Sequence, residues 1–192
     1  MAGVERIELP SKVLETPMLP LYHTPVDKIN YNITINGFQE KYINIYYNNG
    51  DFMVINYTSK ELDLMARLMR AEALAEGNLG MLMVGNVIVN RALASCYTFK
   101  NIRTIYDVIY QNPGGFSGTK SSLFMGSATT KEKQLAERCL KGEYYYPATH
   151  ALWFYAPGTQ TCKSTWYEQP YAGSYKNHCF YRPDKNICQE IY

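Results

Sequence analysis

Alternation of apolar and polar residues predicts a β-hairpin in the first third of the chain. Residues 41–47 read KYINIYY and residues 52–57 read FMVINY, and both alternate with the period of two that is typical of strands. Asn49-Gly50 lies between them, and this dipeptide favours the tight turn that joins two antiparallel strands. Residues 1–28 show no such periodicity and hold four of the nine prolines, so we expect an extended arm there.

Helical periodicity begins directly after the hairpin. Thr58 and Glu61 match the capping box T-x-x-E, in which each side chain bonds a free backbone N–H of the other residue, and Thr129 with Glu132 repeat the pattern. Glycines at 77 and 142 follow the first and last helical segments and favour their termination. The predicted helices span residues 58–76, 79–93, 105–110 and 129–141.

The remainder of the chain favours a loop and then strands. Residues 111–120 read QNPGGFSGTK, and their three glycines and one proline predict a loop. The segments ALWFYAP (151–157) and NHCFYRP (177–183) are rich in the aromatic residues that favour strands. Because the helices come first and most strands later, the order predicts an α+β fold rather than a wound parallel sheet.

Composition narrows the function classes. Apolar residues make up 46% of the 192, which is enough for a core, and a net charge of +2 without a run of Lys or Arg argues against nucleic-acid binding. No apolar run is long enough for a membrane span. The 18 tyrosines favour two interpretations equally: exposed platforms for sugar rings, or ordinary residues of a strand-rich surface.

The cysteines indicate neither a zinc site nor a full disulfide framework. Their number is odd and no pair has C-x-x-C spacing. We expect free thiols, while the crowding of three in the last third leaves one bridge open there. The five are Cys96, Cys139, Cys162, Cys179 and Cys188.

One glutamate falls on the apolar side of the first helix. At 3.6 residues per turn the apolar residues form one stripe, opposite Lys60, Asp63, Arg67 and Arg70. Glu72 projects near the middle of this stripe, and Glu76 lies one turn further along it. The stripe consists of Leu62, Leu64, Met65, Leu68 and Met69.

Burial of Glu72 would favour its protonated form. An apolar environment raises the pKa of a carboxyl group, and a second carboxylate one turn away acts in the same direction. A protonated carboxyl group near neutral pH is what glycoside cleavage requires, because the leaving oxygen must receive a proton. The alternative is a structural glutamate whose carboxylate is satisfied by an arginine or by the backbone.

The segment that contains this glutamate carries a recognisable motif. Residues 64–91 read LMARLMRAEALAEGNLGMLMVGNVIVNR, which resembles the signature of the SleB/CwlJ cell-wall hydrolase family. The shared features are an A-E-A triplet, a second glutamate, a glycine, a V-x-x-V helix and an N-R ending. They fall at residues 71–73, Glu76, Gly80, Val84 with Val87, and Asn90-Arg91.

Downstream segments extend the resemblance in the right order, to cover roughly residues 62–182. Phe116-Ser117 match the family's loop, the segment 151–157 resembles its aromatic strand, STWYEQP keeps Trp166, and NHCFYR resembles the closing segment with His178. Three departures bear on substrate preference: Leu74-Ala75 where Arg-Gly is common, Gly85-Asn86 where small apolar residues are usual, and Gly115 where Gln is usual.

The resemblance implies a lysozyme-like, helix-rich catalytic domain with Glu72 as its single essential acid. The implied substrate is peptidoglycan, cut between N-acetylmuramic acid and N-acetylglucosamine without a metal or other cofactor. As in lytic transglycosylases, Glu72 would act first as acid and then as base, with Glu76 as a tuner or positioner. Candidates for the sugar cleft are Phe116 and Ser117 and, more weakly, Tyr155, Trp166 and His178; ordinary packing is the alternative for each.

Other reactions stay open at this stage. Plain hydrolysis would follow if Glu76 or a distant Asp activated water. A zinc amidase that releases peptide stems needs convergent ligands, whereas only His23, His150 and His178 are present and H-E-x-x-H is missing. A Cys–His peptidase would use Cys179 or Cys162. A wall-binding or virion protein that kept the fold and lost activity is a non-enzymatic alternative.

We expect three regions along the chain. Residues 1–58 form an arm and hairpin that dock to a spore coat, a virion or another partner, residues 59–182 form the catalytic domain, and residues 183–192 form a tail. The first ten residues lack an apolar segment and carry two acidic residues. We therefore expect a protein made in the cytoplasm that reaches the wall without a secretory signal, through a spore coat, a virion or lysis.

Overall fold

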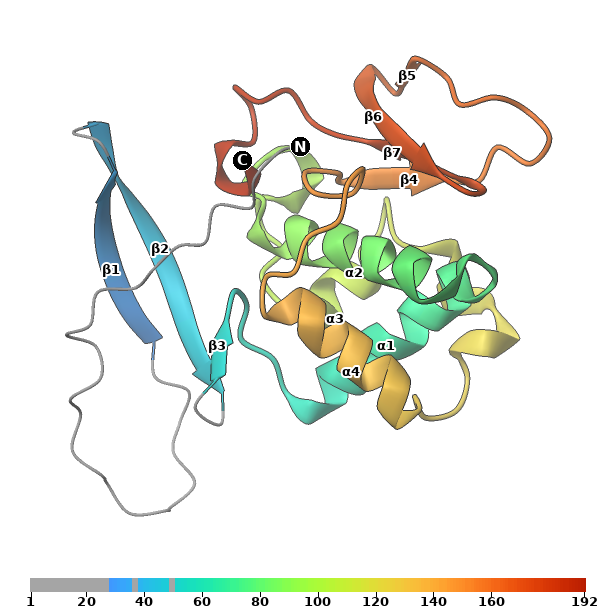
Figure 1. Cartoon of the computed structure of the whole chain (residues 1–192), viewed down its shortest axis with the longest axis horizontal. Coiled ribbons are helices and arrows are strands. Elements are labelled where there is room, and N and C mark those ends of the chain that lie inside the picture. Colours follow the sequence, from blue (N-terminus) through green and yellow to red (C-terminus); the bar gives the residue numbers. More distant parts are fainter. Residues whose placement is uncertain (1–27, 36–37, 49–50) are drawn as a thin grey trace, which may run out of the picture.

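The computed structural model describes residues 28–35, 38–48 and 51–192 (Figure 1). The arm predicted for residues 1–28 lies outside the described residues except for Lys28, and so does the Asn49-Gly50 turn. Helices come first and a strand-rich segment follows them, with a small sheet at the N-terminal side. The predicted α+β class is confirmed.

The N-terminal strands form an antiparallel sheet in the order β1-β2-β3. β2 (Phe38–Asn48) and β3 (Asp51–Met53) pair with Asn48 opposite Asp51, which confirms the predicted hairpin. β1 (Lys28–Ile35) adds a strand that was not among those predicted, although its residues KINYNITI alternate as a strand does. The chain after β3 joins the helical body, since Met53 and Ile55 are buried and the Val54 N–H donates to the Leu140 carbonyl at 2.9 Å.

The helices begin where the capping boxes predict. α1 (Ser59–Ala73) is capped by Thr58, and α4 (Thr130–Leu140) is capped by Thr129. α3 (Ile105–Ile109) is short, as expected. The first helix was expected to continue to Glu76, but it changes at Leu74 into a 3₁₀ turn that ends at Gly77, and α2 (Gly77–Leu93) starts there. Gly77 has a φ of 76°, in the region that favours glycine.

α2 lies at the centre of the helical body and is buried on nearly every side, so its polar residues bind backbone groups. Asn86 Nδ2 donates to the Glu143 carbonyl at 2.6 Å, and Asn90 Nδ2 donates to the Ala151 carbonyl at 2.9 Å. Gly85 allows α4 to approach, because a Cβ there would lie 2.5 Å from Cys139 Sγ. The Gly85-Asn86 departure from the family pattern thus serves helix packing and loop anchoring.

A second antiparallel sheet covers one side of α2 in Figure 1, with the order β4-β7-β6-β5. β4 (Trp153–Tyr155) and β7 (His178–Tyr181) are the predicted strands, and they pair with Phe154 opposite Phe180. β5 (Thr165–Trp166) and β6 (Gln169–Tyr175) were not predicted, since one is two residues long and the other contains a proline and a glycine.

Four of the five cysteines form disulfides, so the expectation of free thiols is wrong for them. Cys162–Cys179 is the bridge that the sequence left open in the last third of the chain. Cys96–Cys188 joins residues 92 positions apart, a pairing that spacing does not signal. Cys139 is free and buried. Cys188 is also buried, so the segment predicted as a tail is bonded to the body.

Candidate active site

Glu72 lies in the last turn of α1, beneath the loop that follows α3. Its side chain is partly buried, and Oε1 accepts a hydrogen bond from the Gly118 backbone N–H at 2.5 Å. The contact requires a glycine, because a Cβ at position 118 would lie 2.7 Å from the same oxygen. The loop thus aims one backbone donor at the carboxyl group.

Arg91 brings a buried positive charge to the same place. It is 5% exposed, and its guanidinium carbon lies 4.4 Å from the ring centre of Phe116 and 5.2 Å from that of Phe99. Its Nε donates to the Leu152 carbonyl at 2.8 Å and Nη1 donates to the Gly114 carbonyl at 3.0 Å. Arg91 therefore fixes the loop against the segment before β4, and Phe116 is buried as part of this arrangement.

Electrostatics favour a protonated Glu72. Burial raises the pKa of this carboxyl group, and it outweighs the opposite effects of the Gly118 N–H, the Arg91 charge and the Ser117 hydroxyl. Burial also lowers the pKa of Arg91 to about 10, against the effect of Glu72, so the guanidinium stays charged near neutral pH. A carboxyl group with a raised pKa beside a fixed cation is suited to donate a proton and then to hold the resulting charge.

Glu76 does not continue the line of Glu72, because the α-helix ends between them. It is 5% exposed, and its carboxylate accepts from Asn177 Nδ2 at 3.2 Å and from the Asn177 N–H at 3.5 Å. Lys176 Nζ donates to the Glu76 carbonyl at 2.7 Å. The prediction that both carboxylates share one stripe is therefore wrong, and Glu76 connects the 3₁₀ turn to the turn between β6 and β7.

His178 is buried close to this connection. Its ring packs edge-on against Phe154, with centroids 5.1 Å apart, and its Nδ1 has no hydrogen-bond partner among the described residues. Burial lowers the pKa of His178 against the opposite effect of Glu76, so the ring is neutral near pH 7. Phe154 also packs on Phe116 at 6.1 Å, which links His178 to the loop over Glu72.

Tyr155 and Trp166 belong to another aromatic cluster. Their ring centroids are 4.8 Å apart, and both rings pack on Tyr181 at 5.7 Å. Neighbouring residues of a strand point to opposite faces of a sheet, so Tyr155 faces away from the side that Phe154 takes. The structure brings Glu72, Phe116 and Ser117 together, whereas Tyr155 and Trp166 lie across the sheet; their sugar-binding role stays a prediction.

Sequence reasoning gave no role to two residues of this site. Arg91 was noted only as part of the N-R ending of the motif. Its position as a charged residue in an otherwise apolar helix is a signal that could have identified it as a site residue. Gly118 carried no signal, because its role depends on where the loop crosses α1. Gly115 has a structural reason as well: a Cβ there would lie 2.4 Å from the Gln111 carbonyl oxygen, so this loop conformation excludes the usual Gln.

The described residues hold neither a metal-binding cluster nor a membrane-spanning helix. In residues 28–35, 38–48 and 51–192, no three His, Cys, Asp or Glu side chains are grouped so that they could hold a metal ion. Over the same part of the chain no helix has the length and apolar character of a membrane span. Cys162 and Cys179, the thiols considered for a peptidase, are bonded to each other.

Comparison with known proteins identifies the family. The family model described as Cell Wall Hydrolase matches residues 75–181. The cell wall hydrolase CwlJ of Oceanobacillus iheyensis is 48% identical over 139 residues, which cover 72% of this chain and 98% of that protein. The chain belongs to the cell wall hydrolase family. CwlJ of Bacillus subtilis is 45% identical over 139 residues, with 72% and 96% coverage.

Solved structures agree with this assignment. The catalytic domain of Bacillus cereus SleB matches with a TM-score of 0.53 and 25% identity, over 66% of this chain and 93% of that one. The catalytic domain of the germination-specific lytic transglycosylase SleB from Bacillus anthracis has the same TM-score at 24% identity, over 66% and 98%, and shows the fold alone. The family-model match begins three residues after Glu72 and so does not include it; the case for Glu72 rests on its geometry and on the A-E-A motif.

Proposed function

We propose that this cell wall hydrolase cuts the glycan strand of peptidoglycan between N-acetylmuramic acid and N-acetylglucosamine, as a lytic transglycosylase. The observation that carries the proposal is the Glu72 carboxyl group: partly buried, with a raised pKa, and bonded to the Gly118 N–H beside the buried charge of Arg91. Such a group is protonated over a wider pH range than a surface glutamate, and it meets fixed positive charge when it ionises.

The reaction needs only this one carboxyl group. Glu72 donates its proton to the glycosidic oxygen, the bond from that oxygen to C1 of the muramic acid breaks, and the N-acetylglucosamine leaves as an alcohol. The resulting carboxylate is stabilised by the Gly118 N–H and by Arg91. It then accepts the proton of the C6 hydroxyl of the same muramic acid, whose oxygen bonds to C1 and closes an anhydro ring. Because this nucleophile is intramolecular, no bound water is consumed.

The environment of Glu76 supports transglycosylation over hydrolysis. An inverting hydrolase needs a second carboxylate that activates water on the opposite side of the sugar. Glu76 is 5% exposed and its carboxylate accepts hydrogen bonds from Asn177. Each of its oxygens thus accepts one bond from the β6–β7 turn, and its burial leaves Glu76 poorly placed to take a proton from water.

Product analysis tests the proposal. Purified protein and its Glu72→Gln variant are incubated with cortex and vegetative peptidoglycan, and the soluble fragments are identified by mass spectrometry. We expect anhydro-muramic ends from the wild type and from a Glu137→Gln control, whose carboxyl group lies on α4. The Glu72→Gln variant should release at least about a hundredfold less, the size of a lost general acid.

Other products would replace the proposal with one of its alternatives. Reducing sugar ends would mean hydrolysis, with a residue other than Glu76 activating the water. Free peptide stems would indicate an amidase and remove Glu72 from the catalytic role. Tight binding to the wall without fragments from any variant would indicate a protein that kept the fold and lost activity.

A further inference from the structure

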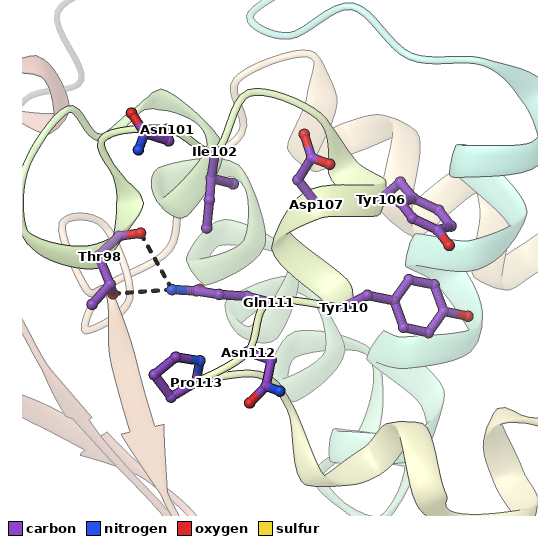
Figure 2. A pocket seen from close by; sticks show the side chains of 9 residues that line it. All are labelled: Thr98, Asn101, Ile102, Tyr106, Asp107, Tyr110, Gln111, Asn112 and Pro113. Carbon is purple, nitrogen blue, oxygen red and sulfur yellow. Dashed lines mark hydrogen bonds between the residues drawn. The ribbon is translucent and has the colours of Figure 1, made fainter.

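A pocket separate from Glu72 opens beside α3. Figure 2 shows it between the short segment that follows α2 and the start of the loop that crosses Glu72, and its volume is about 370 Å³, within the range of ligand sites. Nine residues line it: Thr98, Asn101, Ile102, Tyr106, Asp107, Tyr110, Gln111, Asn112 and Pro113.

The lining combines exposed aromatic rings with neutral polar groups. Tyr106 and Tyr110 are 57% and 48% exposed, and their ring centroids lie 4.7 Å apart at one side of the pocket. Asn101, Asn112 and a threonine supply amide and hydroxyl groups, and Asp107 supplies one carboxylate. None of the nine lining residues is a lysine or arginine, so the pocket is not suited to a phosphate.

Gln111 lines this pocket, and its side-chain amide is held by Thr98. Its Nε2 donates to Thr98 Oγ1 at 3.0 Å, the contact drawn across the centre of Figure 2. The same nitrogen lies 3.5 Å from the Thr98 carbonyl oxygen, which orients the amide. Its Oε1 is buried and has no hydrogen-bond partner in the described part of the chain.

The pocket is joined to the catalytic carboxyl group by a short segment of chain. Gln111 and Gly118 are seven residues apart, so they lie at most about 25 Å from each other even if the chain is fully extended. Arg91 holds the middle of the segment through the Gly114 carbonyl. A glycan strand that runs from the Glu72 carboxyl group toward α3 would therefore reach the pocket within a few of its units.

We propose that this pocket is an accessory subsite that binds an N-acetylated sugar unit of the glycan strand, away from the bond that is cut. Flat apolar rings with polar edges suit the face of a pyranose, and the amide and hydroxyl groups suit its hydroxyl and acetamido groups. The inference rests on the proposed glycan-cleaving function and deepens it: the subsite holds the strand while Glu72 acts.

Binding to soluble glycan strands tests the subsite. The Glu72→Gln variant is titrated with N-acetylated glycan strands that have been stripped of peptide, so that no turnover occurs, and affinity is measured by calorimetry. Adding Tyr106→Ala and Tyr110→Ala together should weaken binding about tenfold, a loss that corresponds to about 1.4 kcal/mol. Tyr146→Ala is the matched control, because that ring is 77% exposed and does not line the pocket. The side-chain amide signals of Gln111 and Asn112 should shift in nuclear magnetic resonance spectra during the titration.

The outcomes separate the subsite from the proposed function. Unchanged affinity in the double tyrosine variant, with anhydro products from the wild type, would overturn the subsite and leave the function standing. An absence of glycan products from the wild type would overturn the function on its own. Binding only by strands that keep their peptide stems would overturn the sugar assignment, because the pocket would then recognise peptide.

Discussion

The Glu72 carboxyl group is subject to opposing effects on its pKa. Burial raises the pKa, while the Gly118 N–H, the Arg91 charge and the Ser117 hydroxyl lower it, and burial is the larger effect. The folded protein therefore binds a proton at Glu72 more tightly than the unfolded chain does. Stability from this group is fully present below the unfolded pKa, near 4.5, and is lost as the pH rises through the folded value.

Replacing Glu72 with Gln should therefore remove activity without removing stability. Glutamine cannot ionise, so the Glu72→Gln variant should unfold at a temperature equal to or above that of the wild type at pH 7, and the two should converge near pH 4. Thermal unfolding between pH 4 and 8 measures this, with Glu137→Gln on α4 as the control. A clearly less stable variant at pH 7 would show that Glu72 is a structural partner of Arg91, the alternative that the sequence left open.

Gly118 should tolerate no side chain. A Cβ at this position would lie 2.7 Å from Glu72 Oε1 and 2.9 Å from Cδ, so Gly118→Ala must push the loop or the carboxyl group away. Loss of one donor to a developing negative charge typically lowers the rate about a hundredfold, and we expect at least about tenfold here. Release of soluble glycan measures the rate. Ser122→Ala, an exposed change in the adjoining segment, should keep normal activity, and full activity in Gly118→Ala would contradict the role of this N–H.

Sequence reasoning reached Glu72 and not its surroundings, for a physical reason. The apolar stripe of α1 and the motif both converge on that position, since helical periodicity is a local property. The positions of Gly118 and Arg91 depend on how a loop 46 residues downstream of Glu72 packs over the helix, which is not local. Glu76 shows the limit of periodicity, because a 3₁₀ turn ended the helix before the stripe could reach it.

At the scale of elements, local signals decided which segments were predictable. Both capping boxes are present in the structure, because their hydrogen bonds involve residues three positions apart. β5 and β6 were missed, since their pairing partners and not their own composition define them. β1 was missed although its residues KINYNITI alternate with the period of a strand. The same distinction explains the glycine at position 85 of α2. Glycine is a poor helix former, and its presence is explained only by the close approach of α4 in the folded chain.

Packing between α2 and α4 makes a prediction at this scale. A Cβ at Gly85 would meet Cys139 Sγ at 2.5 Å and the end of Met69 at 3.2 Å. Gly85→Ala should lower the free energy of unfolding by about 1–3 kcal/mol through overpacking, despite the better helix propensity of alanine. In a Cys139→Ala background the sulfur is gone, so the same change should lose most of its effect. Denaturant unfolding of the four proteins gives the coupling, and additive effects would show that Cys139 is not the obstacle.

At the scale of the molecule, the resemblance in sequence predicted the family, and the order of helices and strands predicted the α+β class; both are confirmed. The family prediction came from the whole series of ordered motifs, which local periodicity could not supply. The boundaries at residues 58 and 182 stay predictions, as does docking through residues 1–58 to a spore coat or virion. The Cys96–Cys188 bridge lay beyond sequence reasoning, because partners 92 residues apart meet only in the folded chain.

The two bridges should stabilise the protein to different extents. A disulfide restricts the unfolded chain, and the restriction grows with the length of the closed loop. Cys96–Cys188 closes a loop of 92 residues and Cys162–Cys179 a loop of 17. Replacing Cys96 and Cys188 with serine should lower the free energy of unfolding by about 4–5 kcal/mol. Replacing Cys162 and Cys179 with serine should lower it by about 3 kcal/mol.

Denaturant unfolding of both serine pairs, with and without a thiol reductant, checks the order. Cys139→Ser adds a buried hydroxyl but breaks no bridge, so reductant should lower its midpoint as much as that of the wild type. Reductant should lower the stability of the wild type by more than that of either serine variant. The wild type has two bridges that can open, and each serine variant has only one. If reductant did not change the midpoint of the wild type, and alkylation found no cysteine protected by a disulfide, the paired cysteines would be free in solution. The sequence-based expectation would then hold, and the C-terminal segment around Cys188 would depend on its packing alone.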